Sequence, residues 1–259
     1  MIMVNFLMVL SRNKTYLATV FCTLYKGEKF IKGYMENMIS QSVFSKVKFH
    51  ILDCNSPENE YETIERYLGY ENILYERLGE DPGLYEGWNI CCKRADTDLV
   101  GNWNVDDRKS PWSLEALIQP FLLDKNLDIS YGPTFVSEKA NENWEEVQKN
   151  VIFPCNETNR WEDLIINNNP HCMPIWKKSI HDRFGYFDSS YKTAADSDMW
   201  IRAVKQGAKI KMVRDVVGIY YQNPNGRSTD PETLKEMLEE VHGMRKKHYP
   251  NYQSKLHLF

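Results

Sequence analysis

Hydrophobic and polar positions along the first half of the chain fall into blocks that predict strands and helices in alternation. The predicted strands are residues 16–24, 47–54, 72–79 and 97–105, each a short apolar run bounded by polar residues or glycine. The predicted helices between them are residues 25–41, 58–69 and 83–95, where apolar residues recur at helical spacing. Strands that alternate with helices predict a mostly parallel sheet with right-handed crossovers.

The second half is less regular and predicts a mixed arrangement. Its segments are a helix at 111–125, a strand with a Gly-Pro bend at 127–138, a polar loop or lid at 138–170, a short strand and an aromatic loop within 171–188, a helix at 194–207 and a strand pair at 208–222. A last helix is signalled by Asp230 as its cap, Pro231 in its first turn and Pro250 after its end.

Length and composition are those of a soluble globular protein. The chain has 259 residues, of which 42% are hydrophobic and 26% charged. No proline- or glycine-rich linker divides it, so we expect one α/β domain over residues 1–259. Within it we expect a ligand-binding half at 16–107, a second half at 108–228 and a C-terminal helix at 229–250.

Charge and cysteine content exclude several classes of protein. The net charge is −4 and no long Lys/Arg tract is present, so a nucleic-acid partner is not expected. The six cysteines form no CxxC pair, which argues against a zinc knuckle and against a secreted disulfide framework. Reduced thiols in the cytoplasm are the simplest interpretation.

The start of the chain, residues 1–12, is apolar for about ten residues, which is too short to span a bilayer, since this takes roughly 20 apolar residues. They also lack the basic start and the cleavage site of a secretory signal. An edge strand, an interfacial segment and an extension upstream of the true start remain open. The expected location is cytoplasmic, with peripheral contact at the inner membrane face as an alternative.

Polar side chains follow three of the predicted strands. Thr23 and Tyr25 end the first, Asp53 ends the second, and Asp106 and Asp107 follow the fourth. Ligands of open parallel sheets bind outside the carboxyl ends of the strands. The topology therefore predicts that these residues, about 80 positions apart in sequence, meet at one edge.

The adjacent acids Asp106 and Asp107 are candidate metal ligands. Mg²⁺ and Mn²⁺ prefer carboxylate oxygens and are usually held by one or two carboxylates together with substrate phosphates. The alternative is that the pair only decorates the start of the helix that follows. Its position beside Asp53 and Thr23 favours the metal site.

Other candidates each have a structural alternative. Asp53 suits a hydrogen bond to a base or a ribose hydroxyl, but also a turn before Pro57. Asp196 and Asp198 lie at a helix start, where one is a candidate general base and both are candidate caps. His171 is a candidate third metal ligand or phosphate contact, or an ordinary histidine.

Several other chemistries lack their motifs. The chain has no GxGxxG after the first strand and no GxxxxGK[ST] loop. It has neither a GxSxG elbow nor an HExxH helix. Dinucleotide binding, a P-loop and these two hydrolytic sites are not predicted.

Four stretches, in order, resemble the inverting glycosyltransferases of family 2, which have the GT-A fold. They are "ATVFCTLYKGEKFIKGYMENMISQS", "KFHILDCNSPENEYETI", "DPGLYEGWNICCKRADTDLVGNWNVDD" and "GYFDSSYKTAADSDMWIRAVKQG". They span about residues 16–220. The resemblance implies a Rossmann-like, mostly parallel central sheet flanked by helices, with a mixed acceptor-side half.

The resemblance also implies roles on the donor side. Thr23, Tyr25 and Asp53 would hold the base and ribose of a nucleotide sugar. Gly83 and Asn89 match the family's Gly-x-x-x-(Ala/Gly)-x-Asn helix, which belongs to the same site.

The metal and catalytic roles follow in the same way. Asp106 would lie near the ribose or the metal, Asp107 would ligate the metal, and Asp196 would be the general base. Two departures stand out: Asn104 occupies the first acidic position of the DxD-type motif at the donor site, and Ala195 replaces a common glutamate. Asp198 is therefore an alternative base.

The leading hypothesis is a metal-dependent glycosyltransferase. It would use Mn²⁺ or Mg²⁺ and a UDP, GDP or dTDP sugar to glycosylate a glycan, lipid-linked or other hydroxyl acceptor, in surface-glycan or polysaccharide assembly. An inactive nucleotide-sugar-binding module or partner subunit is one alternative. A nucleotidyltransferase is another, although "TLYKGEKF" has a single glycine where that class needs a glycine-rich loop.

Overall fold

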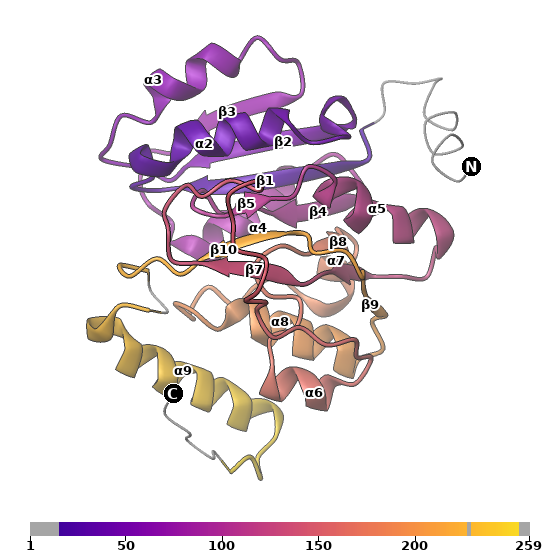
Figure 1. Cartoon of the computed structure of the whole chain (residues 1–259). Helices are drawn as coiled ribbons and strands as arrows, with labels where there is room; N and C mark the ends of the chain where they lie inside the picture. Colours follow the sequence, from indigo (N-terminus) through magenta and orange to yellow (C-terminus); the bar gives the residue numbers. More distant parts are fainter. Residues whose placement is uncertain (1–15, 227–228, 254–259) are drawn as a thin grey trace.

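The structure is a computed structural model that describes residues 16–226 and 229–253 (Figure 1). The apolar segment 1–12 lies outside the described residues, so the three interpretations of it stay predictions. The predicted order of strands and helices is otherwise recognisable along the whole described chain.

The strands are β1 (Ala18–Leu24), β2 (Val47–Asp53), β3 (Ile73–Arg77), β4 (Leu99–Asn102), β5 (Arg108–Lys109), β6 (Ile129–Tyr131), β7 (Thr134–Ser137), β8 (Ile175–Lys177), β9 (Ile210–Met212) and β10 (Gly218–Tyr221). The helices are α2 (Glu28–Ile39), α3 (Tyr61–Ile64), α4 (Leu84–Arg94), α5 (Ser113–Leu123), α6 (Trp161–Ile166), α7 (Ile180–Phe184), α8 (Ala195–Lys205) and α9 (Pro231–His248), with 3₁₀ turns at Phe44–Lys46 and Glu65–Tyr67.

The main sheet has seven strands in the order β3-β2-β1-β4-β8-β6-β9. The first four are parallel, with Leu24 of β1 opposite Asp53 of β2 and Phe21 opposite Asn102 of β4. Strand β8 is antiparallel to both of its neighbours. The predicted α/β class, a mostly parallel sheet with a mixed second half, is confirmed.

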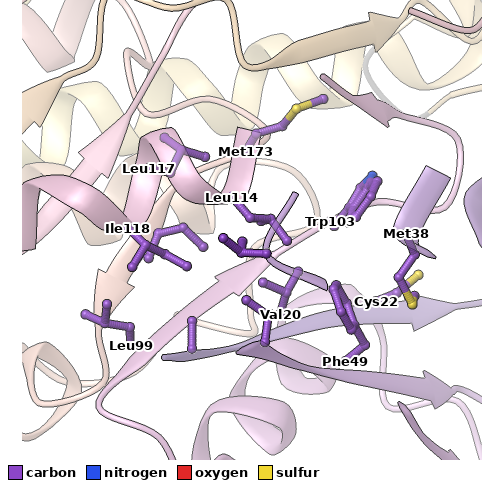
Figure 2. Packing of buried hydrophobic residues seen from close by; sticks show 14 of the residues in the cluster. Val20, Cys22, Met38, Phe49, Leu99, Trp103, Leu114, Leu117, Ile118 and Met173 are labelled. Atoms are coloured by element: carbon purple, nitrogen blue, oxygen red, sulfur yellow. The ribbon is translucent and has the colours of Figure 1, made fainter. Parts of the chain in front are cut away.

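Alternation along β1 explains why helices cover both faces of this sheet. Val20 and Cys22 point into a core shared with α2 and α5, as Figure 2 shows beside Met38 and Leu114. Phe21 points the other way, into a core shared with α4 and α8. A strand buried on both faces reads as a continuous apolar run, which is the pattern that predicted it.

A second sheet, in the order β5-β10-β7, corrects two predictions. Residues 127–138 form two strands in different sheets, β6 and β7, and residues 208–222 form β9 and β10, which do not pair with each other. The link between β6 and β7 packs against the link between β9 and β10. A Cβ on Gly132, in the first link, would lie 2.6 Å from Val217 and 2.8 Å from Val213, in the second. Two chain segments therefore leave the main sheet side by side.

The polar segment 138–170, predicted as a loop or lid, contains helix α6. This helix packs against α8, and its Leu164 and Ile165 are buried in the core below the main sheet. At the far side of the molecule from α2 and α3, α9 lies next to α8 (Figure 1). Among the described helices, none has both the length and the apolar character needed to cross a bilayer.

Close packing of the two sheets predicts the effect of Gly218→Ala. A Cβ at this position would lie 2.4 Å from the carbonyl oxygen of Arg108 and 2.5 Å from Met173 Sδ, and the nearer of these atoms belongs to the backbone. We expect the free energy of unfolding to fall by roughly 1–3 kcal/mol in urea titrations. Gly243→Ala, in the open middle of α9, is the control and should raise stability by about 0.5–1 kcal/mol.

Candidate active site

The carboxyl ends of β1, β2 and β4 lie side by side, so the predicted edge exists. Thr23 is the second-last residue of β1 and lies against α4, where a Cβ on Gly87 would be only 2.8 Å from Thr23 Cγ2. Gly83 precedes α4 with φ +79°, a conformation that favours glycine. The two glycines of the Gly-x-x-x-Gly pattern thus let α4 begin sharply and approach β1 closely.

Tyr25 stands in the loop after β1, with 44% of its surface exposed. Lys26 Nζ lies over its ring, 5.5 Å from the ring centroid. The predicted contact with a base stays a prediction.

Asp53, at the end of β2, is buried and accepts hydrogen bonds from three residues. Its Oδ1 accepts from the Ser56 amide at 2.7 Å, which confirms the turn-forming role. Its Oδ2 accepts from Tyr75 and from Arg77, both at 2.6 Å. The carboxylate therefore holds the Arg77 guanidinium, which is 44% exposed, at the same edge.

Arg77 was not singled out from the sequence. Its position at the end of β3, opposite Asp53 in the register, is the signal that would have found it.

Asn89 is engaged with protein rather than open to a ligand. Its Nδ2 donates to the Phe187 carbonyl at 2.9 Å, and its Oδ1 accepts from the Phe187 amide at 3.0 Å. The side chain thus fastens α4 to the loop after α7. In this arrangement its contribution to a donor site is to place that loop.

The adjacent acids differ in their surroundings. Asp107 is buried, with Oδ1 accepting from the Tyr221 amide at 3.1 Å and Oδ2 from Asn104 Nδ2 at 3.2 Å. Burial, and then the charge of Asp106, raises the pKa of Asp107 well above its usual value. Burial also raises the pKa of Asp106.

Two basic residues follow the acids without forming salt bridges to them in the described structure. Arg108 donates to the carbonyls of Val105 and Asp107, at 2.9 and 2.7 Å. Lys109 is fully buried, and burial lowers the pKa of its ammonium group to about 8. The acids are therefore near positive charge but without a direct cation.

His171 does not complete a metal site. Its ring stacks on Phe153 with the centroids 3.8 Å apart and meets Tyr220 edge-on at 4.6 Å. Burial lowers the pKa of His171 to about 3. Within residues 16–226 and 229–253, no three His, Cys, Asp or Glu side chains are arranged to hold a metal, so the predicted set of Asp106, Asp107 and His171 does not form a three-ligand site.

Asp196 lies in the first turn of α8 and faces α4. Its Oδ1 accepts from the Tyr85 hydroxyl at 3.2 Å and its Oδ2 from Asn168 Nδ2 at 2.6 Å. Burial raises the pKa of Asp196, while these hydrogen bonds lower it. Because Tyr85 lies in the first turn of α4, Asp196 is placed at the carboxyl edge of the sheet.

Asp198 has a different environment, although it is only two residues away. Its Oδ2 accepts from Arg202 Nε at 2.8 Å, and its Oδ1 accepts from Lys247 and His248, both at 2.9 Å. Burial alone would raise the pKa of Asp198, but these three donors hold it well below its usual range. A carboxylate so paired is a poor proton acceptor, so the geometry favours Asp196 over Asp198 as a base.

Residues 19–185 match the sequence model of the family described as "Glycosyl transferase family 2". The chain belongs to this family. The match covers the three strand ends and the acidic pair, and it stops before α8. A search of curated proteins found no match.

Solved structures with the same fold include glycosyltransferases that bind nucleotides. TarS 1–349 of S. aureus in complex with UDP-GlcNAc superposes with a TM-score of 0.70 at 16% identity, covering 92% of this chain and 68% of TarS 1–349. TarS 1–349 with UDP gives 0.66 at 17% identity, with 92% and 67% covered. The mannosyltransferase PcManGT of Pyrobaculum calidifontis, in complex with GDP-Man and Mn²⁺, gives 0.66 at 15% identity, with 93% and 66% covered.

These likenesses confirm the predicted GT-A fold of a family 2 glycosyltransferase. The chain spans about two thirds of TarS 1–349 and 40% of the TarS chain in another structure. The substrates in those complexes belong to those proteins.

The contacts of Asp198 predict a pH-dependent loss of stability in Asp198→Asn. The change leaves the cations Arg202 and Lys247, and the His248 ring, without their carboxylate partner, so we expect the free energy of unfolding at pH 7 to fall by about 3 kcal/mol. Because the folded-state pKa is depressed, the stabilisation is complete above the ordinary pKa of 3.8 and is lost as the pH falls towards the folded value. Urea unfolding of both proteins at pH 7 and pH 3 should show the gap narrowing at pH 3.

Asp188→Asn is the matched control. Asp188 contacts Lys247 at 3.8 Å and is 42% exposed, so its loss should cost less than about 1 kcal/mol. A gap for Asp198→Asn that stays constant with pH would contradict this account.

Proposed function

We propose that this chain transfers a sugar from a nucleotide-diphosphate sugar to an acceptor hydroxyl, with a divalent cation and with inversion at the anomeric carbon. The observation that carries the proposal is the convergence of Thr23, Asp53 and the acidic pair on one sheet edge, with Asp196 brought to it by Tyr85. Donor-binding residues and a candidate base then lie at the same edge. The neighbours that bind UDP, UDP-GlcNAc and GDP-Man support a nucleotide sugar as donor.

The residues at this edge fit a hard divalent cation. Asp106 and Asp107 offer carboxylate oxygens, which Mg²⁺ and Mn²⁺ prefer, and one or two such ligands suffice when substrate phosphates provide the rest. The raised pKa of Asp107 reflects burial and the repulsion of Asp106, both of which a bound cation would offset. The Mn²⁺ in PcManGT supports this assignment.

Asp106 and Asp107 would hold the metal, and His171 is left out. When bound, the metal would stabilise the negative charge that develops on the leaving diphosphate. Thr23, Tyr25 and Asp53, with Arg77 fixed by Asp53, would line the base and ribose.

Asp196 is the proposed general base, and its surroundings suit the role. The acceptor hydroxyl must lose its proton as it attacks the anomeric carbon, and a partly desolvated carboxylate is a stronger proton acceptor than one in water. Tyr85 and Asn168 keep the carboxylate oriented while it is ionised. The acceptor class and the role in surface-glycan or polysaccharide assembly stay proposals that rest on the family.

An inactive binding module is the second candidate. It is favoured by Asn104, which replaces an acid and donates to Asp107 instead of offering a further carboxylate. Nucleotide binding without release of nucleoside diphosphate would identify it.

Metal-dependent nucleotide binding is the first test. We expect UDP, GDP or dTDP to raise the melting temperature in the presence of Mn²⁺ and to have little effect with EDTA. Asp107→Asn should weaken the Mn²⁺-dependent binding at least about tenfold by calorimetry, because it removes a metal ligand. Asp124→Asn, at an exposed site, is the control. The proposal fails if no nucleotide binds and Asp107→Asn changes nothing.

Loss of the base is the second test. Asp196→Asn should lower kcat by roughly 10²–10⁴-fold with the donor that binds best, while donor affinity stays unchanged. Because the folded-state pKa of Asp196 is raised, the wild-type rate should fall with decreasing pH at a midpoint above 3.8. Rates measured from pH 4 to 8 give this midpoint.

Asn168→Ala is the companion variant. It removes a hydrogen bond that favours the ionised carboxylate, so the midpoint should move to higher pH. A midpoint that stays unchanged in Asn168→Ala would argue against Asp196 as the titrating base.

A further inference from the structure

The C-terminal helix α9 holds the turn in front of α8 through one side chain, Glu240. Its Oε1 accepts from the Thr193 amide, the Thr193 hydroxyl and the Ala194 amide, at 2.7, 2.7 and 2.8 Å. Its Oε2 accepts from the Lys192 amide at 2.7 Å. Four donors on three consecutive residues therefore converge on one carboxylate.

Helix α8 has no capping side chain of its own. Its N-cap is Ala194, which has no side-chain oxygen, and no side-chain cap hydrogen bond forms there. Glu240 instead accepts from the amides of the turn that leads into α8, and so attaches this turn to α9. Hydrogen bonds to an ionised carboxylate are stronger than neutral ones, so this contact fixes the direction in which α8 begins.

Asp196 is the second residue of that helix, two positions after Ala194. Two positions further along, Asp198 accepts from Lys247 and His248, which also belong to α9. Helix α9 thus forms hydrogen bonds to the chain both before and after Asp196. On the opposite side, Asn168 and Tyr85 hold the Asp196 carboxylate itself.

We propose that Glu240 is a positioning residue for Asp196. It acts through the backbone of residues 192–194 and does not touch substrate. The inference rests on the proposed function, in which Asp196 is the base. It goes beyond the family match, since Glu240 and all of α9 lie after residue 185.

A positioning role and a purely stabilising role make different predictions. If Glu240 only stabilises the fold, its loss lowers the melting temperature and leaves the turnover of the folded protein unchanged. If it orients Asp196, its loss lowers kcat and leaves donor affinity unchanged, because the proposed base and ribose residues and the acidic pair lie on β1, β2 and β3 and on the segments after β1 and β4. A displacement of about 1 Å at a catalytic group costs up to roughly 10²-fold in rate.

The experiment compares Glu240→Ala and Glu240→Gln with Glu239→Gln in the full chain. Glu239 is the neighbouring residue on α9 and forms an exposed ion pair with Lys235, at 4.0 Å. Glutamine at 240 keeps one oxygen for Thr193 and Ala194 but turns an N–H group towards the Lys192 amide, so its effect should be smaller than that of alanine. Circular dichroism at 20 °C confirms that each variant is folded.

Two readouts are needed. Hydrogen exchange of the Lys192, Thr193 and Ala194 amides reports the contact directly, and these amides should exchange at least about tenfold faster in Glu240→Ala. Release of nucleoside diphosphate, measured with Mn²⁺ and the donor chosen by thermal shift, reports the rate. We expect kcat to fall about 10- to 100-fold in Glu240→Ala, less in Glu240→Gln, and less than about twofold in Glu239→Gln.

The outcomes separate the two proposals. Faster exchange, lower kcat and unchanged donor affinity support the positioning role. Faster exchange with an unchanged kcat overturns it, and so does unchanged exchange or a parallel loss of donor affinity. A wild-type protein that binds donors but releases no nucleoside diphosphate overturns the proposed function, and the role assigned to Glu240 is overturned with it.

Discussion

A buried carboxylate needs a cation or several donors, and this requirement divides the acids of the site into two groups. Asp53 and Asp198 are paired with arginine or lysine, and they serve as joints between strands, helices and loops. Asp107 and Asp196 are also largely removed from water, yet within the described chain neither forms a salt bridge, and the pKa of each is raised. The scaffold thus satisfies the first group internally and leaves the second group able to interact with a cation or a proton.

Much of the fold could be predicted from the sequence because its first half obeys simple periodicities. Runs such as "YLATVFCTL" are long, apolar and bounded, and their order allows essentially one topology once parallel pairing is assumed. The second half could not be predicted in the same way. Strands of three or four residues, such as β6 and β7, carry too little periodicity to reveal that a Gly-Pro step moves the chain from one sheet to another.

In the candidate site, likewise, residues at strand ends could be predicted from the sequence, whereas residues that act through long-range contacts could not. Thr23, Asp53 and Asp107 could be proposed from the sequence because each lies at or after the end of a strand, and the topology alone brings strand ends together. Tyr85 and Asn168 were missed because their importance lies only in their contact with Asp196, 111 and 28 residues away. Choosing between Asp196 and Asp198 likewise depended on knowing that α9 returns to Asp198, which no spacing in "AADSDMWIR" reveals.

The unfavourable burial of Asp106 and Asp107 favours a ligand-binding site over a domain that serves only as structure. The two adjacent carboxylates at the sheet edge are in an unfavourable environment, since burial and the charge of Asp106 both raise the pKa of Asp107. A domain kept only for its shape would gain stability from an uncharged residue at either position. Unfavourable electrostatics of this kind is expected where a ligand of opposite charge offsets it, and a divalent cation held with a diphosphate is such a ligand. The replacement at Asn104 removes a third negative charge from this cluster while leaving two carboxylates, the number from which a substrate-bridged metal site is commonly built.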